Sequence, residues 1–452
     1  GRLRARYVDG KVEEIVFGGV GQWYVKRITW EGTTAHWHER ELPETWAVVP
    51  PDAHFVVDMC HLASYEVRDG YERYGAVLFC NSHRDVIGIW IAPEGTEGAL
   101  HTPGGDPDEW AYAVWRFKVT LYYLAFAATH LVVCHWNVAN SFVTAVREDL
   151  EQSHPVRKMM WPFSFGVIEV NHTAIINLTS YRGALVRLTG LTTEAALQHL
   201  NDVAKAWTYG SFEQMVSHHG VEDMPMVNQG RLLMRCFNTF VGKMLDLYYD
   251  DDDAAERSKG LVCEDRQLVS FWAKVRVAAF GEEHPMALPE LSKDSLREYL
   301  SHFIFYSTAV HELLGNILLD VLLPTTTSTR ILRKDFFGKQ PDGTTRPPQA
   351  TIQEWYRIVC VCASTTTLPQ PLLLPEMSRQ AKRFEREGEA EMARIYRETA
   401  AALEEHVVAK VTVENEDAEV DEKNFELGEK PKKTKFTFGK FDPRRLEISV
   451  SL

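Results

Sequence analysis

The fold is decided by residues 110–155, WAYAVWRFKVTLYYLAFAATHLVVCHWNVANSFVTAVREDLEQSHP. The preceding Pro107-Asp108-Glu109 is typical of a helix start. The longest apolar stretch of the chain, around Leu121 to Cys134, lies inside the segment and is shorter than the roughly eighteen residues that a membrane span needs. We therefore predict a long, buried core helix over 110–150 and no transmembrane segment.

Two histidines, His130 and His135, lie five residues apart in this helix. On a regular α-helix that spacing separates them by about 140°, too far to share a metal ion. A π-bulge has a wider turn, which brings residues i and i+5 onto one face, and such bulges concentrate at functional sites. Taken alone, two histidines in an apolar helix are more typical of satisfied core residues, so the pair needs support from elsewhere in the chain.

That support comes from His311, in STAVHELLGN, and from the apolar ending LEISVSL, whose last residue is Leu452. Chain ends are usually polar and frayed, so an apolar ending favours a terminus that is buried and used. Three imidazoles and a terminal carboxylate form a ligand set that suits non-heme iron or manganese. The sequence does not choose between these two metals.

The rest of the chain divides by pattern. Residues 1–108 are predicted to be a mixed α/β N-terminal part, with short strands at Glu14–Phe17 and Ala76–Phe79 between Gly/Pro-rich turns. Residues 109–452 are predicted to be a helical, metal-binding core, so the fold class is mainly α. Further helices are expected at 193–217, 229–250, 264–279, 293–322, 350–362 and 376–410. The run Asp250–Asp253 is interpreted as a solvated acidic helix end, because it lacks the Gly and Glu of a calcium loop.

Composition narrows the class of protein. The 452 residues are 45% hydrophobic and 25% charged, which is typical of a globular chain. A net charge of −14 leaves no basic stripe for phosphates and argues against a nucleic-acid partner. Seven scattered cysteines favour reduced thiols and a cytoplasmic location, with secretion left open. The oligomeric state is not determined by these patterns.

With these residues in place, the chain resembles the lipoxygenase family. The family's first metal helix has a Trp, an Ala three residues later and a His twenty residues after the Trp, as Trp110, Ala113 and His130 do here, and a second ligand five residues on, as His135. The segment FVGKMLDLYYDDDDAAERSKGLVCEDRQLVSFWAKV is similar to the family's Tyr-Tyr and acidic turn. STAVH matches the approach to the third ligand, and PRRLEISVSL is similar to the family's terminus.

The chain also departs from the family pattern. The family often has Asn, His or Ser four residues after the third His, but here that position is Gly315, followed by Asn316. Either Asn316 turns inward as a ligand, which we favour, or water fills the place. The family's Asp and His-Gln on the first helix are replaced by Leu121 and Ala125-Phe126. No separate N-terminal β-sandwich domain is expected.

The resemblance implies a lipoxygenase-like catalytic domain that binds iron, or manganese, through His130, His135, His311, Asn316 and Leu452. The three histidines and the Leu452 carboxylate would act through a metal-bound hydroxide. It would take a doubly allylic hydrogen from a polyunsaturated fatty acid, and O₂ would add to give a hydroperoxide. Apolar side chains at 159–165 and 303–323 could line the substrate channel, or could be plain helix core. Two alternatives remain: a divergent oxygenase acting on a polyene or terpenoid metabolite, and a metal-free binding protein on the same fold.

Overall fold

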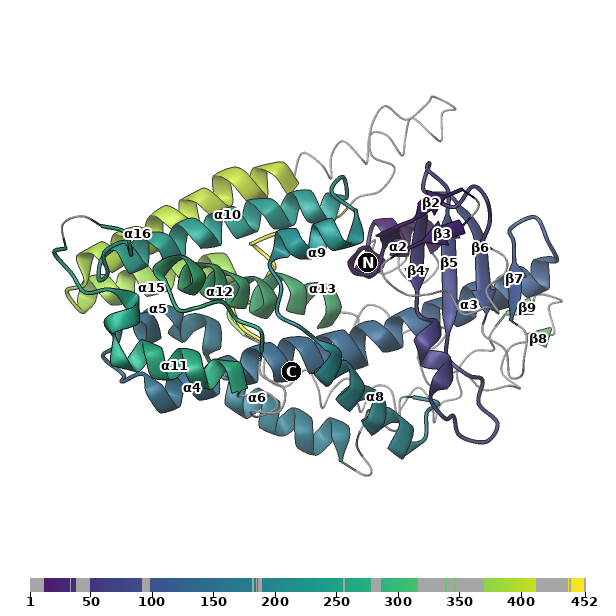
Figure 1. Cartoon of the computed structure of the whole chain (residues 1–452), viewed down its shortest axis with the longest axis horizontal. Coiled ribbons are helices and arrows are strands. Elements are labelled where there is room, and N and C mark those ends of the chain that lie inside the picture. The colour runs from purple at the N-terminus through teal and green to yellow at the C-terminus, as the bar shows by residue number, and fades with distance from the viewer. Residues whose placement is uncertain are drawn as a thin grey trace.

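The computed structural model describes residues 12–32, 34–37, 49–91, 98–180, 183, 185, 189–254, 257–277, 286–315, 370–411, 438 and 440–450, and the backbone of 338–339 and 345–346. A mainly helical body forms most of the elongated molecule, and a small sheet lies at one end of it (Figure 1). The predicted mainly α fold class is confirmed.

The sheet has five antiparallel strands in the order β1-β4-β5-β6-β7. Every residue of the central strand β5 is buried, because its two faces contact different cores. Ala76, Leu78 and Cys80 face the main core, and Val77 and Phe79 face a smaller one. The strands are β1 Lys26–Arg27, β4 Phe55–Asp58, β5 Ala76–Cys80, β6 Val86–Ile91 and β7 Ala99–His101, with separate hairpins of β2 Thr29–Glu31 with β3 Thr34–His36 and β8 Gly338–Lys339 with β9 Thr345–Arg346.

One long helix connects the sheet to the helical body. It runs as α3 (Pro107–Tyr123), the π-helix η3 (Leu124–Asn140) and α4 (Ser141–Asp149). Its start is fixed by Asp106, whose side chain accepts hydrogen bonds from the N–H groups of Asp108 and Glu109, and by Pro107 in the first turn. By length and composition this helix could cross a membrane, but 89% of its apolar window is buried within the protein, as expected of a core helix.

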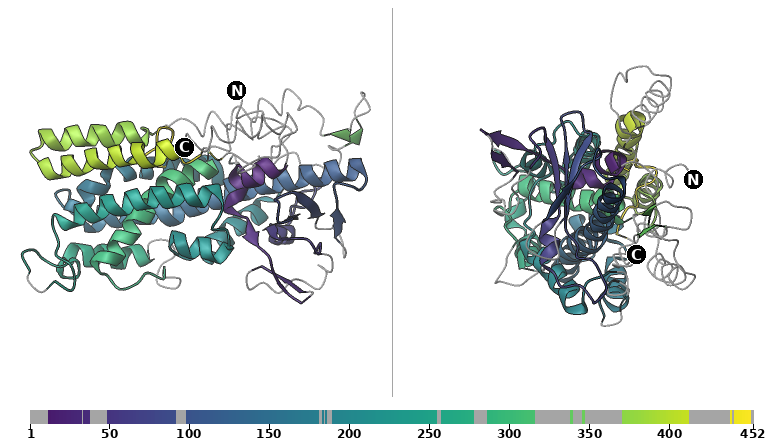
Figure 2. Two further views of the ribbon diagram at one scale, coloured as in Figure 1. Left: turned by 90° about the horizontal axis from the view of Figure 1, so that it is seen from above. Right: turned by 90° about the vertical axis from the view of Figure 1, so that its right-hand side faces the viewer.

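Part of the helical body packs directly on this long helix, and further helices pack on one another beyond it. Figure 2 shows α15 and α16 side by side along one long side of the body, and α16 also packs on α10. The helices are α2 Val12–Phe17, α5 Pro155–Ser164, α6 Val167–Ala174, α8 Thr193–Ala206, α9 Phe212–His219, α10 Pro225–Asp246, α11 Arg266–Val277, α12 Lys293–Phe305, α13 His311–Gly315, α15 Leu373–Arg386 and α16 Ala390–Ala402. Shorter 3₁₀ and π segments are η1 Val20–Trp23, η2 Cys60–Ser64, η4 Ile175–Thr179, η5 Val262–Glu264, η6 Tyr306–Val310 and η9 Leu403–Val408.

Three sequence predictions need correction. Glu14–Phe17 belongs to helix α2 and not to a strand, because a four-residue apolar run carries no distinguishing period. The expected helix at 193–217 is two helices, since the Ser211 side chain and Gln214 form a capping box that starts α9. The expected helix at 376–410 breaks at Gly388, which adopts φ +81°. The strand at Ala76–Phe79 is confirmed, and the expected helix 350–362 lies outside the described residues.

Asp251–Asp253, in the acidic run after α10, are exposed, as predicted for a solvated helix end, and the run also pairs with a lysine. Lys293 is buried, and its Nζ donates to the backbone oxygen of Tyr249 at 3.0 Å and to Asp251 at 2.7 Å. Nζ also lies 2.7 Å from Asp246 Oδ1. The interpretation as a solvated acidic helix end is therefore confirmed, and these acids also join α10 to the first turn of α12.

Candidate metal centre

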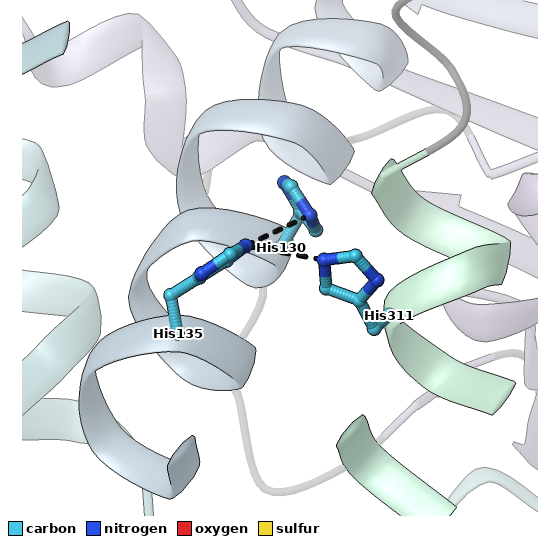
Figure 3. A group of neighbouring side chains, drawn as sticks. All are labelled: His130, His135 and His311. Atoms are coloured by element: carbon cyan, nitrogen blue, oxygen red, sulfur yellow. Dashed lines mark hydrogen bonds between the residues drawn. The ribbon is translucent and has the colours of Figure 1, made fainter. Parts of the chain in front are cut away.

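Three buried imidazoles meet between the long helix and the segment that carries His311. Figure 3 shows His130 and His135 projecting from one helix and His311 from the helix opposite, with the rings turned toward one another. His135 Nε2 lies 3.2 Å from His130 Nε2 and 3.2 Å from His311 Nε2. The structure thus brings together three of the five predicted ligands. Asn316 and Leu452 lie outside the described residues, so their ligand roles stay predictions.

The π-helix explains how residues five apart share a face. Both His130 and His135 lie within η3, where the turn is wider than in an α-helix. The predicted π distortion is therefore confirmed. A second π segment, η6, ends at Val310, directly before His311, and packs against η3. Local widening on both sides of the contact thus directs the three imidazoles at one point.

The spacing of the ring nitrogens fits a common metal ion. Ligand nitrogens held at roughly 2.0–2.1 Å from one ion lie about 2.9 Å apart at right angles and about 3.4 Å apart in a tetrahedron. The observed 3.2 Å falls between these values. Without an ion, two unprotonated nitrogens at this distance would point lone pairs at each other. The three histidines therefore fit a metal, and imidazole suits iron and other transition metals.

Burial keeps the His130 and His135 imidazoles neutral, as metal ligation requires. Removal from water lowers the pKa of His130 well below its usual value, and the neighbouring His311 and His135 lower it further. Burial lowers the pKa of His135 to about 4, although its hydrogen bond with Asn171 opposes the shift. At neutral pH both rings consequently present lone pairs and not positive charge.

Asn171, on α6, fixes the orientation of His135. Its Nδ2 donates to the backbone oxygen of His135 at 3.0 Å, which identifies the other amide atom as the acceptor. Oδ1 therefore accepts from His135 Nδ1–H at 2.9 Å and leaves Nε2 unprotonated toward the centre. Sequence reasoning did not assign Asn171 this role. Its signal was weak because the contact joins residues 36 positions apart.

Phe126 supports the first ligand. Its ring stacks on that of His130, with centroids 5.7 Å apart and planes 26° apart. Phe126 belongs to the Ala125-Phe126 pair that stands where the resemblance leads us to expect His-Gln. An apolar ring therefore packs on His130 where a polar side chain was expected. His130 is only 6% exposed as a result of such packing.

The expected channel residues have mixed outcomes. Phe303 stacks on Phe142 with centroids 3.7 Å apart, and Phe163 packs on Phe240, so both are helix core. Trp161 and Phe165 are exposed at the surface. A small cleft is lined by residues of α5, α10 and α16, with Met159 and Met244 among them, and none of the three histidines lines it. Residues 316–323 lie outside the described part of the chain.

Comparison with known proteins relates this chain to lipoxygenases. No family model matches the chain. It is 24% identical over 240 residues, 48% of its length, to a putative linoleate 9S-lipoxygenase 3 of Oryza sativa subsp. japonica, and 21% identical over 224 residues, also 48% of its length, to a polyunsaturated fatty acid lipoxygenase of Mus musculus. These regions cover 26% and 32% of the two relatives, so the chain spans about a quarter to a third of the curated relatives it matches.

Solved structures agree in fold over nearly the whole chain. A coral 8R-lipoxygenase superposes with a TM-score of 0.71 at 14% identity, covering 98% of this chain and 67% of that one. The manganese lipoxygenase of Gaeumannomyces graminis gives 0.68 at 15% identity, covering 98% and 79%. The chain therefore shares the lipoxygenase fold, and about half of it resembles lipoxygenases in sequence at 21–24% identity.

Gly315 marks the main departure of this centre from the ligand pattern that the sequence resemblance led us to expect. It lies on α13 four residues after His311, on the same helix face, and carries no side chain that could reach a metal. Among the described residues, three imidazoles make up the cluster that could hold an ion. Free thiols are found at Cys60, Cys80, Cys134, Cys236 and Cys263, as the scattered cysteines predict.

Proposed function

We propose that this chain is a non-heme metal dioxygenase of the lipoxygenase type. It would abstract a doubly allylic hydrogen from a polyunsaturated fatty acid and add O₂ to give a lipid hydroperoxide. The observation that carries the proposal is the convergence of three buried imidazoles, with His135 Nε2 3.2 Å from each of the other two Nε2 atoms, from a π-helix and a facing helix. The relatives named for linoleate and polyunsaturated fatty acids support the substrate class.

His130, His135 and His311 would hold the ion. Bound iron or manganese would supply one-electron redox chemistry, and the manganese-named structural neighbour keeps both metals open. Asn171 would hold His135 Nδ1–H, so that the Nε2 lone pair stays directed at the centre. Phe126 and the surrounding apolar residues would exclude water from the first ligand, which favours radical chemistry over competing hydrolysis.

The first test is metal content. The purified chain should contain iron or manganese in an equimolar amount by elemental analysis. His135→Ala should lose most of that metal, because the removed ring contacts both other imidazoles. His218→Ala is the matched control, since His218 is exposed at the end of α9, and it should retain the metal. A native chain without transition metal, after attempted reconstitution, would overturn the proposal.

The second test is the reaction. The metal-loaded chain should consume O₂ with linoleic or arachidonic acid and form a conjugated diene that absorbs in the near ultraviolet. Product analysis over a panel of polyunsaturated lipids would then give the position of oxygenation. If no panel member is oxidised by the loaded chain, the fatty-acid activity is refuted. Oxidation of a polyene or terpenoid metabolite would identify the alternative oxygenase instead.

A further inference from the structure

Gly315 sits in contact with the first ligand. A Cβ added at residue 315 would lie 2.5 Å from His130 Nε2, 2.9 Å from its Cδ2 and 3.2 Å from its Cε1. Non-bonded carbon and nitrogen atoms do not approach to 2.5 Å. With His130 in this position, residue 315 therefore has to be glycine.

The His130 ring has little freedom to move aside. Phe126 stacks on one side of it, and its centroid lies 4.7 Å from that of His135 and 4.6 Å from that of His311. Gly315 has helical geometry and is not among the described residues with positive φ. Backbone conformation thus does not require glycine here, and in a helix glycine costs about 1 kcal/mol relative to alanine. The requirement is for space beside the ligand nitrogen.

The position that a Cβ of residue 315 would occupy is close enough to His130 Nε2 to be a neighbouring ligand position on a shared metal ion. Two atoms bound at right angles to one ion at roughly 2.0–2.1 Å lie about 2.9 Å apart, closer than non-bonded contacts allow. The Cβ position of residue 315, 2.5 Å from His130 Nε2, overlaps such a neighbouring ligand position. A side chain at 315 would therefore either fill that position or displace His130.

We propose that Gly315 keeps a coordination position beside His130 open for a small exogenous oxygen- or nitrogen-donor ligand, which in other members of the fold a side chain on this helix could occupy. The proposal rests on the proposed metal-binding function. It takes the solvent-filled alternative at this place over a ligand role for Asn316, and it does not depend on Leu452. The expected ligand is monodentate and of solvent size, since the space corresponds to a single atom position of the sphere.

The experiment uses the full chain reconstituted with Co²⁺, whose visible absorption reports coordination independently of turnover, and azide as the probe. Azide should change the spectrum of the wild-type protein saturably. In Gly315→Ser the added Cβ and hydroxyl should fill the open position, so the azide response disappears, and the contact with His130 should weaken Co²⁺ binding as in Gly315→Ala. In Gly315→Ala the methyl should push His130 aside and weaken Co²⁺ binding roughly 10–100-fold.

Gly230→Ala is the matched control. Its added Cβ would lie 2.5 Å from Phe212 Cζ, so it brings an equally close contact without touching the histidines. This variant should lose stability but keep both the Co²⁺ spectrum and the azide affinity. If both Gly315 variants lose Co²⁺ while Gly230→Ala still binds it, the result would also support the conclusion that residue 315 lies next to the metal.

Two results overturn the inference. One is a wild-type Co²⁺ spectrum that azide does not change. The other is a Gly315→Ser variant that binds azide as tightly as the wild type. Neither of these two results would argue against metal binding by the three histidines. Failure of the wild-type chain to bind Co²⁺, iron or manganese would instead refute the proposed function together with the inference.

Discussion

The contact between Asn171 and His135 gives the sharpest test of how the fold shapes the centre. Asn171 is 3% exposed and makes two hydrogen bonds with His135, one to the ring and one to the backbone. Asn171→Ala removes both partners and leaves two buried polar groups unsatisfied. At about 1–3 kcal/mol for each such group, the free energy of unfolding should fall by roughly 2–5 kcal/mol.

Metal affinity should fall as well. Without the Oδ1 acceptor, neither the tautomer nor the ring orientation of His135 is fixed, so the Nε2 lone pair is no longer held toward the other imidazoles. Loss of such a supporting partner usually weakens metal binding about 10–100-fold, or roughly 1.4–2.7 kcal/mol. Asn171→Asp, which keeps an acceptor at the ring, should recover most of the affinity while losing the bond to the His135 backbone oxygen.

The measurement is competition between the apo-protein and a chelator of known affinity for Mn²⁺ or Zn²⁺, alongside urea unfolding. Asn137→Ala is the matched control, because Asn137 is similarly buried and lies on η3 with His135, but its side chain donates to the Ala204 backbone oxygen at 3.0 Å. It should lose stability without losing metal affinity. Wild-type affinity in Asn171→Ala, or an equal loss in Asn137→Ala, would refute the reasoning.

Three further outcomes are expected. His302 accepts from the Phe212 N–H at 2.6 Å, and burial lowers its pKa to about 4. This folded-state pKa lies below the unfolded value of roughly 6.5, so neutral His302 stabilises the fold fully above pH 6.5. About 3 kcal/mol of the free energy of unfolding is lost as the pH falls from 6.5 toward 4. Urea unfolding at several pH values should show a smaller loss in His302→Asn. Lys293→Met should destabilise by about 1–3 kcal/mol in urea unfolding, since the Tyr249 backbone oxygen loses its buried donor; unchanged stability would contradict its role in joining α10 to α12. Gly388→Ala should cost about 1–2 kcal/mol from backbone strain alone, because φ is +81° and no atom crowds the added Cβ; a thermal midpoint equal to the wild type would exclude that strain.

Local patterns in the chain predicted much of the framework correctly. The start at Pro107, the buried helix beyond it and the π distortion around His130 and His135 all depend on residues close in sequence. Errors arose where short patterns are ambiguous, as in Glu14–Phe17, or where a single residue ends a helix, as Gly388 does. Neither kind of error changed which residues were proposed as metal ligands.

The sequence by itself determined which imidazoles to consider, because the five-residue spacing on one helix is a local property of η3. Tertiary structure decided what surrounds them. His311 meets His135 across 176 positions, and Asn171 meets it across 36. The need for glycine at 315 follows only from the place of the His130 ring. Such contacts depend on how separate helices pack, and residue spacing along the chain carries no information about that packing.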